Sequence, residues 1–272
     1  MGAPLAFRRL TVAGPPPRIE RMSGHSKWSS IKHKKGAADA KRGKLFTKLA
    51  RAITVAARDG GGNVDANPAL GLAVQKARDA SMPKDNIQRA IDRGTGEGGD
   101  AAAIESVVYE GYGPGGAAIM VEVLTDNRNR TGSEIRHVFD RHGGSLGEPG
   151  SVAWQFEKRG VILVDGERYG EDDLMPAIDA GAEDVTEDGD LLKVTTAAAD
   201  LAAVRSALES AGVEVQSAEL SMEPKSTVEV GESEAPSLLR LMDALEEHDD
   251  VDSVHANFDV PEEIIERVAA AN

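Results

Sequence analysis

Apolar residues in the first third of the chain recur every three to four positions, which is the spacing of one face of an α-helix. In residues 39–58 this face contains Leu45, Leu49 and Ile53, and most of the lysines and arginines fall on another face. The pattern predicts an amphipathic helix with one face that packs and one that is cationic.

Two shorter helices are expected after this one. Asn67 is suited to cap a helix N-terminus and Pro68 to occupy its first turn, so a helix is predicted to run to about residue 80. A third helix is predicted over residues 83–93, with Gly94 placed to end it. The first domain is therefore expected to be helical.

From about residue 106 the hydrophobic period changes from 3.6 to 2, which indicates strands separated by helices. A capping-box spacing at Thr131 and Glu134 predicts a helix start there. The expected strands cover residues 107–109, 118–123, 152–156, 161–164, 184–186, 191–195, 214–220, 227–230 and 251–258, and the helices cover 131–142, 172–180, 199–211 and 236–247, with a last helical turn from residue 261.

The order of these elements predicts an α+β, multidomain protein. Residues 160–222 have the strand and helix order of a split β-α-β, or ferredoxin-like, unit. The flanking segments supply a second such unit. We expect a basic helical N-terminal domain (22–99) followed by two ferredoxin-like α/β domains, the third (160–222) inserted into the second (100–159 and 223–272). Residues 1–21 are expected to be a disordered extension or a mis-assigned start before Met22.

Composition narrows the class of protein. The 272 residues include no cysteine, which excludes thiolate nucleophiles and disulfides and fits a reducing compartment. No apolar run reaches the roughly 18 residues of a membrane helix, so we expect a cytoplasmic protein without a membrane partner. The net charge of −15 is segregated: residues 1–94 carry 19 Lys and Arg against 7 Asp and Glu, and the remaining 178 carry 12 against 39. A basic arm on an acidic body is typical of nucleic-acid binding.

Candidate nucleic-acid-binding residues concentrate in this basic arm. Lysine and arginine neutralise phosphates, and aromatic rings can stack on unpaired bases. The alternative is a solvated basic helix face. The candidates are His25, Lys27, Trp28, Lys32, His33, Lys34, Lys35, Lys41, Arg42, Lys44, Lys48 and Arg51.

A second candidate is the loop 125–131, which joins a strand to a helix. Arg128 and Arg130 stand just before the expected helix N-terminus, a position that favours anions. A phosphate site there and a turn whose arginines pair with neighbouring acids are equally compatible with the sequence.

Other motifs do not indicate chemistry. Gly111-x-Gly113-x-x-Gly116 has dinucleotide-binding spacing, but a proline interrupts it and a strand pattern follows where a helix is needed. His137 and His142 lack the i, i+4 spacing of helical metal ligands. Acidic runs such as residues 246–250 are interpreted as solvated faces and caps. We expect no enzyme activity, no cofactor, no metal and no small-molecule substrate.

Several ordered motifs resemble the YebC/PmpR family. They are Met22-Ser23-Gly24-His25-Ser26-Lys27-Trp28, Ile31-Lys32-His33-Lys34-Lys35, Lys44-Leu45-Phe46-Thr47-Lys48-Leu49, Met82-Pro83-Lys84-Asp85-Asn86-Ile87, Tyr109-Glu110-Gly111-Tyr112-Gly113-Pro114-Gly115-Gly116 and Thr125-Asp126-Asn127-Arg128-Asn129-Arg130-Thr131. The resemblance runs from Met22 to the last residue. The family includes the mitochondrial translational activator of cytochrome c oxidase subunit I.

The resemblance implies the same three-domain arrangement and a non-enzymatic, cytoplasmic regulator of gene expression. Bacterial members are described as probable transcriptional regulators that bind DNA, whereas other members act in translation on the ribosome and relieve stalling at proline runs. Three hypotheses follow: a regulator on promoter DNA, a translation factor on ribosomal RNA, and a protein-interaction adaptor. An acidic body and rings suited to base stacking favour RNA slightly.

Overall fold

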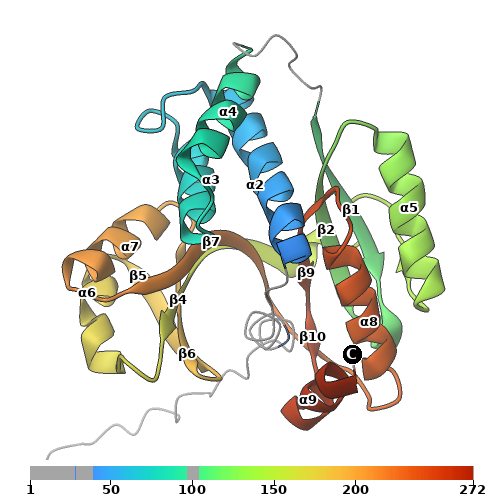
Figure 1. The fold of residues 1–272 in the computed structure, drawn as a ribbon. Helices are drawn as coiled ribbons and strands as arrows, with labels where there is room; N and C mark the ends of the chain where they lie inside the picture. The colour runs from blue at the N-terminus through green and yellow to red at the C-terminus, as the bar shows by residue number, and fades with distance from the viewer. Residues whose placement is uncertain (1–27, 29–38, 97–103, 272) are drawn as a thin grey trace, which may run out of the picture.

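The computed structural model describes residue 28, residues 39–96 and residues 104–271, and these form three domains (Figure 1). A helical domain lies against two α/β domains, which we call the outer domain and the inserted domain. Two long strands connect the outer domain to the inserted domain (Figure 1). No helix among the described residues is both long and apolar enough to cross a membrane.

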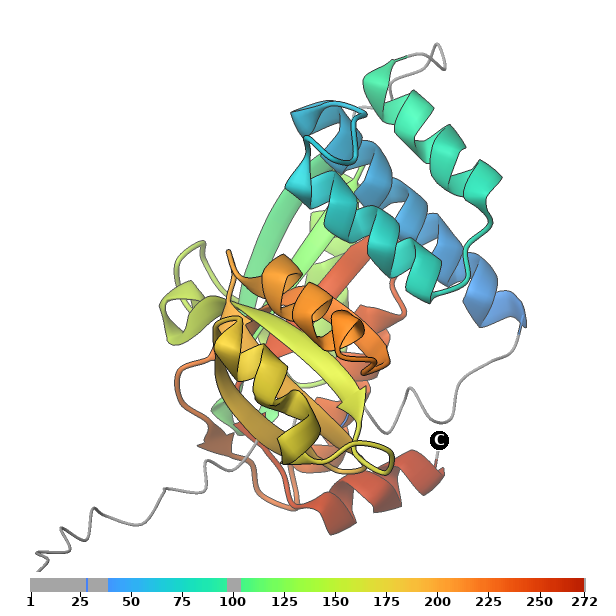
Figure 2. The ribbon, with the colours of Figure 1, turned by 90° about the vertical axis from the view of Figure 1, so that its left-hand side faces the viewer.

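The helical domain contains three helices: α2 (Asp39–Gly60), α3 (Pro68–Asp79) and α4 (Lys84–Thr95). Figure 2 shows them side by side above the inserted domain. Their apolar faces form one core, which includes Leu49, Ile53, Leu70 and Val74. The periodicity of the sequence therefore predicted the helices and, in α2, the burial of Leu49 and Ile53, but Leu45 of the same predicted face is 43% exposed.

Polar and small residues fix the connections in this domain. The side chain of Asn67 caps α3 by accepting from the Leu70 N–H at 3.1 Å, and it donates to the Ala56 and Gly61 carbonyls at 2.8 Å. Gly94 does not end α4 as predicted, because Gly96 is the C-cap, with φ of 83°. Gly94 instead allows close packing: a Cβ there would lie 2.4 Å from the Thr54 carbonyl oxygen of α2.

The outer domain is built on a four-stranded sheet of order β3-β1-β2-β9. The strands are β1 (Glu105–Tyr112), β2 (Ala118–Thr125), β3 (Ser145–Leu146) and β9 (Val251–Ala256). Helices α5 (Arg128–Arg141) and α8 (Ala235–Glu246) cover one face of this sheet (Figure 1). Strands β8 (Val228–Glu229) and β10 (Phe258–Asp259) pair in parallel, and α9 (Glu262–Ala271) follows.

Helix α5 begins earlier than predicted. The N-cap is Asn127, whose side chain accepts from the Arg130 N–H at 3.1 Å, so α5 already includes Arg128. Thr131 is fully buried inside the first turn. The capping-box interpretation was wrong because Asn127, three residues before Arg130, is an equally good cap that the spacing rule did not weigh.

The inserted domain has the ferredoxin-like topology that the sequence predicted. Its strands are β4 (Phe156–Asp165), β5 (Ala182–Asp188), β6 (Leu191–Ala197) and β7 (Val215–Pro224), in the order β5-β6-β4-β7 with every neighbouring pair antiparallel. The 3-10 turn η3 (Glu171–Leu174) with α6 (Met175–Asp179), and helix α7 (Leu201–Ser210), supply the two crossovers. The outer sheet has a different order, since β1 and β2 form a hairpin without an intervening helix.

Strands β4 and β7 pair continuously from Phe156 with Pro224 to Val164 with Val215. The predicted boundaries at 159/160 and 222/223 fall inside these two strands. The predicted strand at residues 152–156 is mostly the 3-10 turn η2 (Ala153–Gln155). A carboxylate holds that turn: buried Glu110 accepts backbone N–H groups from Gly150, Val152 and Ala153 at 2.7 to 2.8 Å.

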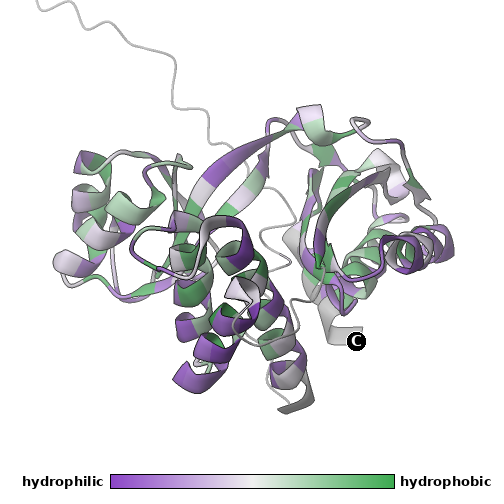
Figure 3. Ribbon diagram, turned by 90° about the horizontal axis from the view of Figure 1, so that it is seen from above, coloured by the Kyte–Doolittle hydropathy of each residue, from purple (hydrophilic) through white to green (hydrophobic). Residues whose placement is uncertain are grey.

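The predicted α+β, multidomain class is confirmed. Seen from above, the strands of the outer sheet are mainly hydrophobic, and hydrophilic segments follow the outer sides of the helices (Figure 3). Each domain has its own buried core, as expected when a chain of this length divides into several folded units.

Candidate nucleic-acid interface

Part of the cationic face of α2 is turned toward the outer domain. Lys44 Nζ lies 3.3 Å from Asp249, and Lys48 Nζ donates to the Glu246 carbonyl at 2.6 Å. Arg51 donates to the Asp249 carbonyl at 2.9 Å. These cations, which we predicted to contact nucleic acid, therefore have partners within the protein, at the last residue of α8 and on the acidic turn that follows it.

Asp250 connects the two predicted sites. Its Oδ1 accepts from Arg51 at 2.6 Å, and its Oδ2 accepts from Arg130 at 2.8 Å and Thr131 at 2.6 Å. The Asp250 side chain is only 3% exposed. Burial alone would oppose ionisation, but the bonds from Thr131, Arg130 and Arg51 outweigh it and hold the pKa of Asp250 well below its ordinary value.

The loop 125–131 is ordered by the same carboxylate. The Thr125 hydroxyl lies 3.2 Å from Asp250 Oδ2 and also accepts the Asn127 N–H at 2.9 Å. Arg130 pairs with Asp126 at 3.0 Å as well as with Asp250. For Arg130, the structure therefore agrees with the alternative of pairing with acids, whereas Arg128 is exposed and has no ion pair within the described residues.

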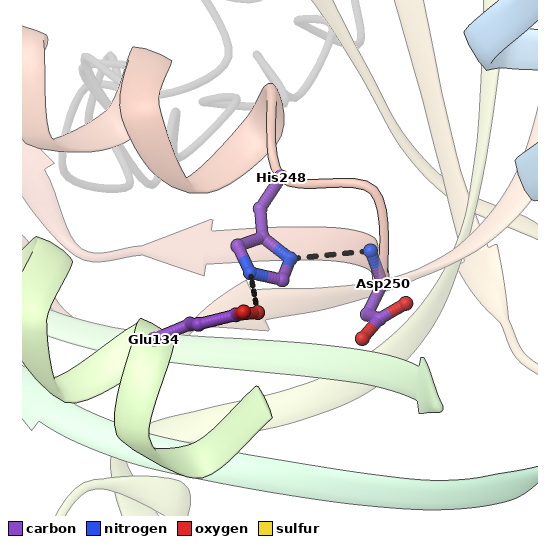
Figure 4. A group of neighbouring side chains, drawn as sticks. All are labelled: Glu134, His248 and Asp250. Carbon is purple, nitrogen blue, oxygen red and sulfur yellow. Dashed lines mark hydrogen bonds and ion pairs between the residues drawn. The ribbon is translucent and has the colours of Figure 1, made fainter. Parts of the chain in front are cut away.

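Glu134, His248 and Asp250 place potential metal ligands within 4.8 Å of one another (Figure 4). However, His248 Nδ1 accepts the Asp250 N–H at 3.1 Å, and its Nε2 lies 3.0 Å from Glu134. The guanidinium of Arg130 already contacts the same carboxylates. We interpret the group as an ion-pair network and infer no metal from it.

Trp28 does not have the exposed ring that base stacking requires. It is 2% exposed and packs in the core of the outer domain, beside residues of the sheet and of α8. The prediction failed because tryptophan is common both in cores and at interfaces, and a neighbouring run of lysines does not distinguish the two.

The remaining predicted residues are only partly placed. Arg42 is exposed on α2 and forms no ion pair within the described structure. For Lys41, the structure describes only the backbone, which is part of α2. The other candidates lie outside the described residues: His25, Lys27, Lys32, His33, Lys34 and Lys35.

Four cations that we did not single out are the more accessible ones. They are exposed, and none forms an ion pair within the described part of the chain. Arg89 and Arg93 are four residues apart on α4 and so share one face of the helix. The sequence could have identified them by their helical spacing, since they are basic residues on predicted helices within the segment 22–94. The four are Arg78, Lys84, Arg89 and Arg93.

A second junction joins the helical domain to the inserted domain. Lys76 of α3 pairs with Glu219 of β7 at 2.6 Å, and Arg205 of α7 pairs with Asp79 of α3 at 3.1 Å. Burial would lower the pKa of Lys76, but the nearby carboxylate of Glu219 raises it overall. Ion pairs therefore fix the helical domain to both α/β domains.

Comparison with known proteins identifies the family. Residues 26–97 match the family model of the TACO1/YebC protein N-terminal domain, and residues 104–258 match that of the TACO1/YebC second and third domain. A protein of Rubrobacter xylanophilus named "Probable transcriptional regulatory protein" is 63% identical over 249 residues, which is 91% of this chain and 100% of the relative. A protein of the same name from Pelotomaculum thermopropionicum is 55% identical, over 88% of this chain and 99% of its own.

A solved structure has the same fold. The crystal structure of a conserved hypothetical protein from Aquifex aeolicus superimposes with a TM-score of 0.80 at 48% sequence identity, and the match covers 87% of this chain and 98% of that chain. The resemblance expected from the sequence motifs is thereby confirmed. The chain belongs to the TACO1/YebC family.

Proposed function

We propose that this protein is a non-enzymatic regulator of gene expression that binds nucleic acid through its helical domain. The relatives described above carry the name of transcriptional regulatory proteins, which supports a regulator and makes duplex DNA the first target to test. The proposal extends that name to a physical role for particular residues of this chain.

The main support is the segregation of charge. Residues 1–94 carry a net charge of +12, while the rest of the chain carries −27. Phosphate polymers are attracted to the first part and repelled by the second, so binding is directed to the basic first part, which includes the helical domain. The cations on α3 and α4 that form no ion pair with any described residue supply contacts that need no prior rearrangement.

The paired cations on α2 divide into two classes. The Lys44–Asp249 pair is exposed, with 60% and 68% of the two side chains accessible, so phosphates can compete with Asp249 for Lys44. Asp250, in contrast, is buried and holds Arg51 through a short bond. We therefore assign Arg51 to the junction between domains and Lys44 to the binding surface.

Binding of a labelled DNA duplex should be measured between about 0.05 and 0.2 M salt, where phosphate contacts dominate the change in affinity. In one variant Arg78, Arg89 and Arg93 become Gln. In the control, three arginines of the acidic domains, Arg136, Arg168 and Arg267, become Gln, so both variants lose the same net charge. The first variant should bind more weakly, with a salt slope smaller by about 3, and the control should change little.

Equal losses in the two variants would show that only net charge matters and would contradict the proposed surface. A promoter regulator should also prefer some duplexes over random sequence at about 0.15 M salt. Preference for single-stranded RNA instead would indicate translational control. Burial of Trp28 removes that ring from the stacking argument that favoured RNA, and His33, the other ring in that argument, lies outside the described residues.

A further inference from the structure

A pocket of about 440 Å³ lies at the opposite end of α5 and α8 from Asp250. Its walls come from the last turn of α5, the start of α8 and the turn η1 (Pro114–Gly116). Arg130, near the start of α5, and Arg141, at its end, are eleven residues apart, which is roughly 16 Å along a helix. The pocket is therefore separate from the Asp250 network and from the helical domain.

Two arginines and a histidine converge on this pocket. Arg141 and His142 enter from α5, and Arg240 enters from α8. Burial lowers the pKa of His142, and the charges of both arginines, which line the same pocket, lower it further. At neutral pH the imidazole is therefore largely uncharged and can donate a hydrogen bond beside two fixed positive charges.

Among the described residues these arginines have no ion-pair partner, although the segment that contains them is strongly acidic. Residues 95–272 contain 39 Asp and Glu against 12 Lys and Arg, yet neither Arg141 nor Arg240 forms an ion pair within the described residues. Among the described residues, the one side-chain hydrogen bond that either arginine forms is long, from Arg240 to the Ser237 hydroxyl at 3.5 Å. Glu234 is the one acidic residue in the wall, and its carboxylate accepts from Ser233 at 2.9 Å.

The backbone at the start of α8 does not create this site. The N–H groups of Glu234 and Ala235 bond to the Gly231 carbonyl, and those of Ser237 and Leu238 bond to the Glu234 carbonyl. The positive potential comes from the side chains. Two guanidiniums, an imidazole and the Ser237 hydroxyl form the donor set that planar or tetrahedral oxyanions require, and arginine in particular favours phosphoryl oxygens.

We propose that this pocket binds a phosphoryl group, with Arg141 and Arg240 as its charged ligands and with His142 and Ser237 as neutral donors. The group has two possible sources, a free phosphorylated small molecule or a backbone phosphate of bound nucleic acid. The site also gives a role to the Gly111–Gly116 turn. Gly113 and Gly115 pack against Leu238 and Val230, where a Cβ would lie 2.7 and 2.9 Å from their methyl groups, and so bring Pro114 to the wall.

The test uses the full chain and inorganic pyrophosphate in isothermal titration calorimetry at low salt. Arg141→Gln and Arg240→Gln should each weaken binding about tenfold or more, because each removes charge-assisted hydrogen bonds. Glu234→Gln should strengthen it by removing the one repelling carboxylate. Arg136→Gln, an exposed arginine of α5 that does not line the pocket, is the matched control and should leave affinity unchanged.

The second arm repeats the nucleic-acid titrations with the same variants. If pyrophosphate does not bind, the salt slope of nucleic-acid binding decides. A decrease of about 1 in Arg141→Gln and in Arg240→Gln, without a decrease in Arg136→Gln, identifies the ligand as a backbone phosphate. If Arg136→Gln changes the affinity for pyrophosphate as much as the pocket variants do, the proposal is overturned. So does the absence of any effect in both arms. The helical-domain variant should leave pyrophosphate affinity intact, so failure of this site and failure of the proposed function can be distinguished.

Discussion

Replacing Asp250 with asparagine tests whether one carboxylate holds the helical domain against the outer domain. The change keeps the shape of the side chain but leaves the guanidiniums of Arg51 and Arg130 without their shared counter-charge. Removing one partner of a buried ion pair costs about 3 to 5 kcal/mol. The Arg51 and Arg130 side chains are 28% and 44% exposed, so water compensates in part, and we expect a loss near the lower limit, about 3 kcal/mol.

The neighbouring residue supplies the control. Asp249→Asn removes the same charge from an exposed pair with Lys44 and should cost less than about 1 kcal/mol. Urea unfolding followed by tryptophan fluorescence measures both losses. Trp154 is 68% exposed, so a Trp154→Phe background leaves buried Trp28 as the sole reporter. Equal losses for the two substitutions would refute the assignment of Asp250 as the buried partner.

Asp250 should also make the stability of the protein depend on pH, in the opposite direction to a histidine switch. Because folding lowers the pKa of Asp250 below its ordinary value of 3.8, its contribution is fully present above that pH and is lost as the pH falls further. The stability difference between the wild-type protein and Asp250→Asn should therefore be constant near neutrality and shrink below pH 4. A difference that grew on acidification would contradict this account.

Three further predictions concern single positions. Gly94→Ala should destabilise the helical domain by about 1 to 3 kcal/mol through overpacking against α2, whereas Gly43→Ala, in open space on α2, should stabilise it by about 0.5 to 1 kcal/mol, both measured by thermal unfolding. Glu110→Gln should accelerate hydrogen exchange of the backbone amides that Glu110 binds. The His255 imidazole, 3.7 Å away, and a hydrogen bond from Ser253 lower the pKa of Glu122 to about 2, so stability that depends on Glu122 should be lost between about pH 4.5 and 2, and Glu122→Gln should flatten that slope.

Local patterns in the sequence were sufficient for most of the fold. Helical spacing located α2 and α3, and the alternation of elements located the inserted domain together with its ferredoxin-like order. The start of α5 was displaced because Asn127 and Thr131 are both good caps, and only packing decides between them: Thr131 is needed inside the helix to reach Asp250. The predicted boundaries between the two α/β domains were also imprecise, because β4 and β7 continue across them.

The candidate interface was less predictable because it depends on contacts between distant parts of the chain. Lys48 and Glu246 are 198 residues apart, and no local rule relates a basic helix to an acidic turn at that separation. The acidic run was interpreted as solvated for this reason, although Asp250 is buried. The opposite charges of the two parts were nevertheless visible, and the same segregation that suggested nucleic acid also permits the protein to use its own carboxylates as partners.

The Asp250 network can form only late in the synthesis of the chain. Asp250 is synthesised 199 residues after Arg51, which at about 5 to 20 residues per second is a delay of roughly 10 to 40 s. During this interval the cationic face of α2 leaves the ribosome without the turn that will neutralise it. We therefore expect the nascent helical domain to attract polyanions more strongly than the finished protein does, because the last α/β segment neutralises part of the cationic face of α2.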